Sequence, residues 1–166
     1  MKLKGEYIVD CKDKKGNWKW SEKVSNIVTT TGITHIIARG LDTDMAETGD
    51  WYVGIVGTSA SAVAAADAMG SHAGWTESTL YAEDTRPEWS KTQSGVSIGN
   101  TAAKATFTLD VDGTTIGGAF LSSSKTAGGS SGILMSVAAF SAKKTGDSGD
   151  KLEVSYKIVG SDDESS

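Results

Sequence analysis

The side chains best suited to chemistry lie together in one stretch, residues 67–89, which reads DAMGSHAGWTESTLYAEDTRPEW. Two of its carboxylates, such as Glu77 and Glu83, could serve as the acid and nucleophile of a glycoside hydrolase. That chemistry needs two carboxyl groups about 5–9 Å apart on facing walls. The acids here are close in sequence on expected strand edges and turns, where charges protect a sheet edge against aggregation. We therefore favour a structural role for them.

The remaining polar groups of this stretch also fit a loop better than an active site. His72 has no companion histidine or cysteine with which to hold a zinc ion. We expect His72, Gly74 and Trp75 to shape a turn, and Arg86 to pair with Glu83.

Two other motifs suggest chemistry but lack the groups that it requires. GDSGD (146–150) resembles the nucleophile loop of trypsin-like serine proteases, whose serine needs a histidine base and a carboxylate. His35, however, lies inside a helical apolar pattern, so a hairpin loop is expected. DVDGTT offers Asp110 and Asp112 to calcium, but the position for the bidentate glutamate is Leu121. We expect no enzyme, no metal and no cofactor.

The elements that must position these residues are mostly strands. GEYIVDC and WKW, separated by the polar turn KDKKGN, predict a β-hairpin. Ile33, Ile36, Ile37 and Leu41 follow helical spacing, which predicts a helix over 31–39 closed by Gly40. The alanine-rich run SAVAAADAMGSH predicts one or two further helical turns.

Alternating strands and turns dominate the rest of the chain. DWYVGIVGT, KATFTLDV, TIGGAFL, GILMSVAAF and DKLEVSYKIV each predict a strand. The fold class expected is all-β with one or two short helices, a β-sandwich or jelly-roll-like domain. We divide the chain into an N-terminal β-hairpin or arm (1–28), the sandwich (29–160) and a disordered acidic tail (161–166).

Charge is distributed unevenly along the chain. Seven lysines and four acids give the first 23 residues a net charge of +3, so the remainder carries −8 of the total −5. An acidic protein is a poor nucleic-acid binder, because phosphate attraction dominates such binding. A basic hairpin could instead dock on an acidic protein surface. The partner-binding residues expected there are Trp18, Trp20, Lys14, Lys15 and Tyr7. The alternative is a solvated hairpin whose tryptophans pack on their own sheet.

Cysteine content and hydropathy bear on the cellular compartment that we expect for the protein. The single Cys11 excludes an internal disulfide and fits a buried strand position. The first residues, MKLKGEYIVD, lack the apolar region of a signal peptide. The most apolar stretch, WYVGIVGTSASAVAAADAMG, is interrupted by polar residues and would insert poorly into a membrane. We expect a soluble protein made in the cytoplasm.

Six segments, in order, resemble small virion proteins encoded among the head and structural genes of tailed bacteriophages. They are WYVGIVGT, DAMGSHAGWTE, YAEDTRPEW, TTIGGAFL, GGSSGILMSVAAF and GDKLEVSY. The resemblance covers about residues 29–158. It does not include the first 28 residues, and the stretch TSASAVAAADAMG departs from it by being richer in alanine.

This resemblance implies a β-sandwich or jelly-roll without a cofactor. It further implies a capsid decoration (cement) protein, a homo-oligomer that binds the major capsid protein on the outer shell of the virion. One alternative is a tail- or fibre-associated module that binds a host-surface glycan through Trp18, Trp20 or Trp75. A glycoside hydrolase using Glu77 and Glu83 is a weaker alternative.

Overall fold

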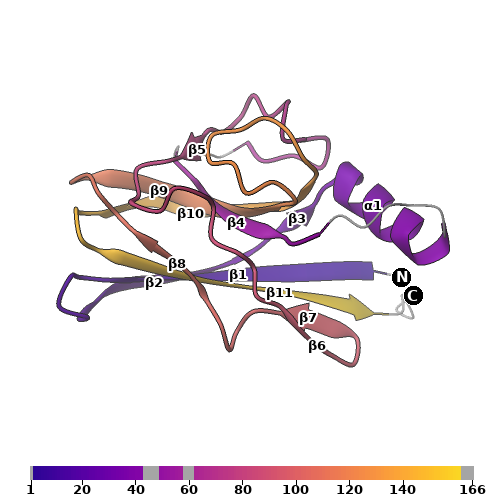
Figure 1. Ribbon diagram of the computed structural model, residues 1–166, viewed down its shortest axis with the longest axis horizontal. Coiled ribbons are helices and arrows are strands. Elements are labelled where there is room, and N and C mark those ends of the chain that lie inside the picture. The colour runs from indigo at the N-terminus through magenta and orange to yellow at the C-terminus, as the bar shows by residue number, and fades with distance from the viewer. Residues whose placement is uncertain (1, 43–48, 58–61, 162–166) are drawn as a thin grey trace.

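The strands form two antiparallel sheets that face each other (Figure 1). A computed structural model describes residues 2–42, 49–57 and 62–161. Within those ranges the chain contains eleven strands and one helix. This confirms the predicted all-β, sandwich-like fold with a short helix.

The larger sheet has the strand order β2-β1-β11-β7-β6, with β8 also paired to β11. Its strands are β1 (Lys2–Lys12), β2 (Trp18–Ser25), β6 (Thr92–Ser94), β7 (Ser97–Gly99), β8 (Ala105–Thr108) and β11 (Lys151–Ser161). The smaller sheet has the order β3-β10-β9-β4-β5. Its strands are β3 (Ile27–Val28), β4 (Tyr52–Val56), β5 (Glu77–Ser78), β9 (Thr114–Ser122) and β10 (Leu134–Gly146).

The core lies between the sheets, and strand alternation places its residues there. On β11 the alternate residues Leu152, Val154, Tyr156 and Ile158 are buried, as the sequence pattern predicts. Tyr7 of β1 lies opposite Tyr156 in the strand register, and the two rings stack with centroids 4.0 Å apart. Such burial of alternate apolar side chains is the main stabilising term of the fold.

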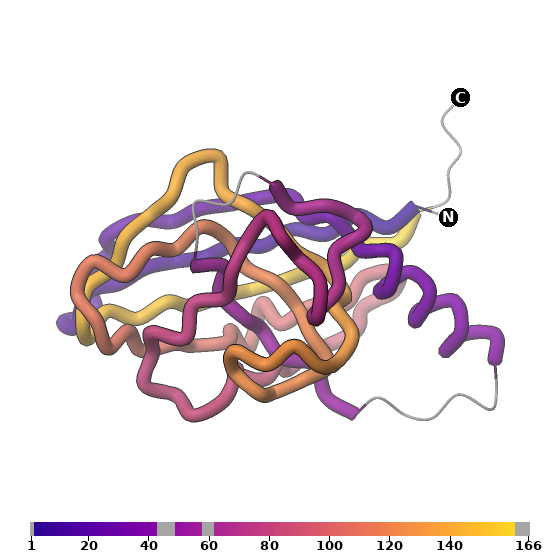
Figure 2. The backbone as a smooth tube through the Cα atoms, turned by 90° about the horizontal axis from the view of Figure 1, so that it is seen from above, coloured from indigo at the N-terminus to yellow at the C-terminus, as the bar shows by residue number. Residues whose placement is uncertain are grey.

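A second buried cluster lies on the other face of the smaller sheet, under what we call the loop layer, residues 62–87 and 123–133. Figures 1 and 2 show these loops crossing the outside of β4, β9 and β10. The cluster contains Val56, Met69, Trp75, Phe120, Leu134 and Val137. Strand β9 is therefore buried on both faces, which explains the continuous apolar run from Ile116 to Leu121 in its sequence.

The single described helix is α1 (Thr30–Leu41), which confirms the helix predicted over 31–39. Thr29 caps it by accepting a hydrogen bond from the Gly32 N–H (3.0 Å). Gly40 does not close the helix, because the Asp42 N–H still bonds to the Ala38 carbonyl. The helix buries Gly32 and His35, while Ile33, Ile37 and Leu41 stay exposed.

The alanine-rich run does not form the helical turns that were predicted. Its described part, 62–72, consists of turns, with Ala68 and Ser71 exchanging two backbone hydrogen bonds. The carboxylate of Asp67 accepts a bond from the Ala64 N–H (2.9 Å), so a local side-chain contact replaces helical hydrogen bonding. Tertiary packing of Met69 and Trp75 on the sheet fixes this conformation.

The N-terminal hairpin is an integral part of the larger sheet rather than a separate arm. Strand β1 pairs with β11 along its whole length on one side, and on the other side its residues from Glu6 to Lys12 pair with β2. Figure 1 places the β1–β2 turn at one end of the sandwich, and α1 with both termini at the other. Of the expected acidic tail, Ser161 ends β11, and 162–166 lie outside the described residues.

Candidate functional site

The turn of the hairpin is fixed by one aspartate. Both the Lys15 N–H (2.8 Å) and the Asn17 N–H (2.9 Å) donate to Asp13 Oδ1. The Asn17 side chain donates to the other carboxylate oxygen (2.9 Å). These bonds hold the pKa of Asp13 below its ordinary value, the Asn17 side chain contributing most. Gly16 takes a positive φ of 87°, which few other residues tolerate. The turn at the basic tip of the hairpin is therefore held in one conformation by specific hydrogen bonds.

A β-bulge separates Trp18 from Trp20, so the predicted pair does not share one face. The register pairs Cys11 with Trp20 but Lys12 with Trp18, which leaves Lys19 as the extra residue. Because neighbouring residues point to opposite faces of a strand, this insertion turns Trp18 to the outer side. Trp18 is 62% exposed.

Trp20 belongs to the core side of the hairpin. Its ring meets Phe140 of β10 edge to face at a centroid distance of 6.3 Å. Its indole N–H donates to the Thr145 carbonyl (2.9 Å). Trp20 thus joins the larger sheet to the smaller one, and only Trp18 has an exposed ring to offer a partner.

Lys12, Lys14, Lys15 and Lys19 are the lysines near Trp18 in the hairpin sequence and strand pairing, and two of them are paired with acids. Lys12 lies over the Trp18 ring, 4.8 Å from its centroid, and pairs with Glu153 at 2.6 Å. Lys19 contacts Asp147 (2.8 Å) and Asp150 (2.6 Å), and these hydrogen bonds raise its pKa.

Lys14 and Lys15 are exposed and form no ion pair with any acid in the described ranges. We call Lys12, Lys14, Lys15 and Trp18 the hairpin surface. It combines the exposed Trp18 ring with the positive charges of Lys14 and Lys15, a combination suited to an acidic protein surface.

Tyr7, the fifth residue expected to bind a partner, does not lie on this surface. Its side chain is fully buried, and its hydroxyl is 2.7 Å from Ser136 Oγ of the facing sheet. Burial raises the pKa of Tyr7, and the neighbouring Tyr156 adds to the effect. A buried ring has no surface to offer, so Tyr7 is a core residue, and its assignment to partner binding is corrected.

The stretch 67–89 is the centre of the loop layer. Trp75 is 2% exposed, rests against Phe120, and is covered by the stacked ring of His72 at 3.9 Å. Its indole N–H donates to Asp67 Oδ2 (3.0 Å). The ring of Trp75 is therefore enclosed and has no face left on which a sugar could stack.

The expected pairing of Arg86 with Glu83 is wrong. Arg86 binds Glu77 through two hydrogen bonds (2.8 and 2.7 Å), and the buried guanidinium lies over Phe120. Glu83 instead accepts a hydrogen bond from the Thr108 N–H (3.0 Å). Both carboxylates of the proposed hydrolase pair are thus engaged in structural contacts.

The two motifs that suggested other chemistry form turns. GDSGD lies between β10 and β11, as predicted, and is closed by the Asp147 N–H bonding to Asp150 Oδ2 (2.8 Å). Asp112 accepts a hydrogen bond from the Ser148 N–H (2.9 Å). In residues 2–42, 49–57 and 62–161 no three His, Cys, Asp or Glu side chains form a group able to hold a metal. No described helix is long and apolar enough to span a bilayer.

Sequence reasoning missed two features of the surface. The contact of Lys12 with Trp18 could have been inferred from cross-strand pairing, had the bulge been recognised. A cavity at the opposite end of the sandwich, lined in part by Trp51 and Trp89, carries no local sequence signal, because its walls come from segments far apart in the chain.

Comparison of this chain with protein families, with curated proteins and with solved structures finds no match.

Proposed function

We propose that this chain is a capsid decoration (cement) protein of a tailed bacteriophage, which binds the major capsid protein on the outer shell as a homo-oligomer. The observation that carries the proposal is the ordered set of six segments that resembles phage virion proteins. The six segments are separated along the chain. If they form one structural unit, their residues should contact one another in the folded protein.

Residues from several of the six segments contact one another. Trp75, from the second segment, packs on Phe120 of the fourth. Arg86, from the third, lies over the same ring at 5.2 Å and pairs with Glu77 of the second. Five of the six segments therefore fall mainly on the smaller sheet with its loop layer, the sixth, GDKLEVSY, falls on β11 of the larger sheet, and binding would be carried by surfaces outside these segments.

Two exposed surfaces lie at opposite ends of the sandwich (Figure 1). One is the hairpin surface. The other is the outer side of α1, where Ile33, Ile37 and Leu41 are 41%, 49% and 84% exposed. A protein that contacts the capsid at both of its ends can bridge neighbouring capsid subunits. Because such contacts repeat over the whole shell, many weak contacts together give strong attachment.

The direct test is binding of the purified chain to expanded capsids that lack it, assembled from the major capsid protein of the same genome. We expect co-sedimentation at a fixed ratio and a higher melting temperature of the capsid. Binding should weaken with salt, since exposed charges are screened. If the purified chain neither binds these capsids nor changes their stability, the proposal is wrong.

Charge-matched variants locate the contact on the folded protein. Lys14→Glu with Lys15→Glu should weaken capsid binding, whereas Lys125→Glu with Lys157→Glu makes the same change in net charge at exposed sites elsewhere and should not. Equal losses from both variants would show that only net charge matters and would contradict docking through the hairpin.

Exposure of Trp18 also favours a second candidate, a tail- or fibre-associated module that stacks this ring on a host-surface glycan. Binding to a glycan array that is lost in Trp18→Ala would support it. No signal across the array would exclude it.

A further inference from the structure

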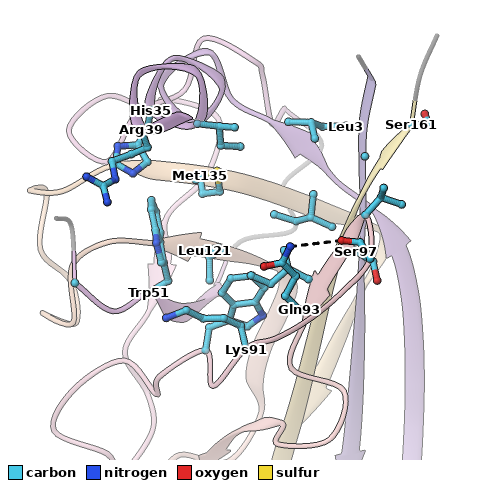
Figure 3. A pocket seen from close by; sticks show the side chains of 18 residues that line it. Leu3, His35, Arg39, Trp51, Lys91, Gln93, Ser97, Leu121, Met135 and Ser161 are labelled. Carbon is cyan, nitrogen blue, oxygen red and sulfur yellow. Dashed lines mark hydrogen bonds between the residues drawn. The ribbon is translucent and has the colours of Figure 1, made fainter. Parts of the chain in front are cut away.

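A cavity of about 990 Å³ opens at the end of the sandwich opposite the hairpin surface. It lies between α1, the β6–β7 hairpin and the ends of the two sheets, and Figure 3 shows the side chains around it. Protein interiors are normally filled to the density of organic crystals, so an opening of this size between two sheets is unusual. Sites for small molecules have volumes of about 300–1,000 Å³, and this cavity falls within that range.

The inner wall of the cavity is apolar and comes from both sheets. Trp51, Trp89, Leu121, Met135 and Ile158 line it, and each is at most 8% exposed. The Trp89 indole N–H donates to the Tyr156 carbonyl (3.1 Å), and the Trp89 backbone N–H donates to the Trp51 carbonyl (2.7 Å). Because these bonds hold both tryptophans in place, the wall is already formed for an apolar ligand.

The basic side chains at the mouth of the cavity are already engaged within the protein. Lys91 pairs with Asp50 at 3.7 Å, and Arg39 also has an interaction partner. Burial lowers the pKa of His35, and the positive charge of Arg39 lowers it further, which favours the neutral imidazole. No carboxylate of the described residues lines the cavity. A ligand that carried an ionised group inside would therefore bury that charge without a partner, which weakens binding.

Two further polar side chains at the mouth, Gln93 and Ser97, are uncharged (Figure 3). The Ser97 hydroxyl donates to the Ser94 carbonyl (3.0 Å), and its oxygen can still accept a hydrogen bond. An amide and a hydroxyl suit an uncharged polar group of a ligand, such as a hydroxyl or an N–H. The mouth thus accommodates one neutral polar group, while the interior offers apolar surface.

We propose that this cavity binds one uncharged hydrophobic small molecule. Its apolar rings or chain lie between the sheets against Trp51 and Trp89, and any polar group lies at the mouth near Gln93 and Ser97. This site is separate from the hairpin surface and does not depend on the proposed capsid role.

Two fluorescent probes that differ by a single sulfonate test the ligand chemistry. N-phenyl-1-naphthylamine is uncharged at pH 7, and 8-anilino-1-naphthalenesulfonate is the same ring system with one negative charge. Titration of the full chain, followed by probe fluorescence, should give saturable binding of one molecule of the uncharged probe. The sulfonate should bind at least tenfold more weakly, because its charge would be buried without a partner. Equal or tighter binding of the sulfonate, or no saturable binding of the uncharged probe, would overturn the proposal.

The five tryptophans of the chain locate the bound probe, because each has an indole N–H that gives its own NMR signal. The signals are assigned with single Trp→Phe variants. Saturation with N-phenyl-1-naphthylamine should shift the indole signals of Trp51 and Trp89. The signals of Trp18 and Trp20 in the hairpin, and of Trp75 under the loop layer, should stay in place. Shifts confined to the last three would place binding elsewhere and refute this site.

Variants that narrow the cavity provide an independent check. Ile98→Trp and Leu3→Trp each enlarge a lining side chain and should weaken binding of the uncharged probe at least fivefold. Val111→Trp, at an exposed position outside the lining, makes a similar change and should not weaken it. Thermal unfolding verifies that each variant is folded, and either of the two lining variants suffices if the other does not fold. Unchanged affinity in a folded lining variant would contradict binding inside the cavity.

Discussion

The guanidinium of Arg86 is completely buried and is held by the carboxylate of Glu77 in a two-pronged ion pair, Nε to Oε1 at 2.8 Å and Nη2 to Oε2 at 2.7 Å. Two further donors bond to the carbonyls of Ser124 (2.7 Å) and Gly129 (3.1 Å). The Gly128 N–H also donates to Glu77 (2.8 Å). One ion pair therefore ties the two segments of the loop layer together over the Phe120 ring.

Removing Arg86 should destabilise the fold strongly. We expect Arg86→Ala to lower the free energy of unfolding by about 3–5 kcal/mol, because it leaves the Glu77 charge buried without its partner. Arg86→Lys keeps the charge but cannot form the two-pronged contact, so it should recover only part of the loss. Urea denaturation gives these values, with Lys125→Ala in the same layer as the control. A cost below about 1 kcal/mol for Arg86→Ala would contradict the structural role of the pair.

Asp10 should make stability depend on acid pH. Burial alone would raise its pKa, but hydrogen bonds from Lys104 (2.8 Å) and Ser21 (2.6 Å) outweigh this and hold the pKa below the ordinary 3.8. A lowered folded-state pKa contributes stability above pH 3.8, and that contribution is lost as the pH falls through the folded value. We expect Asp10→Asn to cost about 1.5–3 kcal/mol at pH 7.

The same substitution should cost less at an acidic pH than at pH 7, because the wild-type carboxylate becomes protonated as the pH falls through its lowered pKa. Urea midpoints at the two pH values give the comparison, with Asp84→Asn as an exposed control in the loop layer. A cost that is equal at both pH values would show that the charge of Asp10 is not what stabilises the sheet.

The bulge at Lys19 predicts different results for the two hairpin tryptophans. Trp18→Ala should change the free energy of unfolding by less than about 1 kcal/mol, since exposed surface positions contribute little. Trp20→Ala should cost about 2 kcal/mol through its contact with Phe140 and its lost hydrogen bond to Thr145. Thermal unfolding and capsid co-sedimentation, measured on both variants, separate stability from binding. A Trp18→Ala protein as unstable as Trp20→Ala would place both rings in the core.

The framework could be predicted from sequence because its signals are local. The alternation of Leu152, Val154 and Tyr156 identifies β11, and the spacing of Ile33, Ile36 and Ile37 identifies α1. Those patterns do not show which part of the protein each face of a strand or helix packs against. The helix buries His35 instead of Ile33 and Ile37, because a small residue, Gly32, lets it approach the backbone of Met135.

The binding surfaces depend on features that local patterns do not encode. An inserted residue at Lys19 reverses the face of Trp18, and a two-residue alternation cannot reveal it. Arg86 pairs with Glu77 rather than Glu83, although Glu83 is nearer in sequence, because Glu77 on β5 lies within reach of the guanidinium while Glu83 bonds to the Thr108 N–H. The cavity wall combines residues from α1 and both sheets, so its composition becomes visible only in three dimensions.

Two glycine substitutions should have opposite effects on stability. A Cβ on Gly54 of β4 would overlap the ring of Phe120, which is buried under Trp75 and Arg86 and cannot move away freely. Gly54→Ala should therefore cost about 1–3 kcal/mol through overpacking. A Cβ on Gly40 of α1 meets no atom within 4 Å. Because alanine is the better helix former, Gly40→Ala should stabilise by up to about 1 kcal/mol.

Thermal unfolding of the two variants, side by side, tests the packing of the smaller sheet under the loop layer. Both changes add one methyl group, so a common effect on the unfolded chain cancels in the comparison. A neutral Gly54→Ala would mean that Phe120 can leave its place beneath Trp75 and that the loop layer is looser than the contacts imply. A destabilising Gly40→Ala would mean that the last turn of α1 packs against another part of the protein.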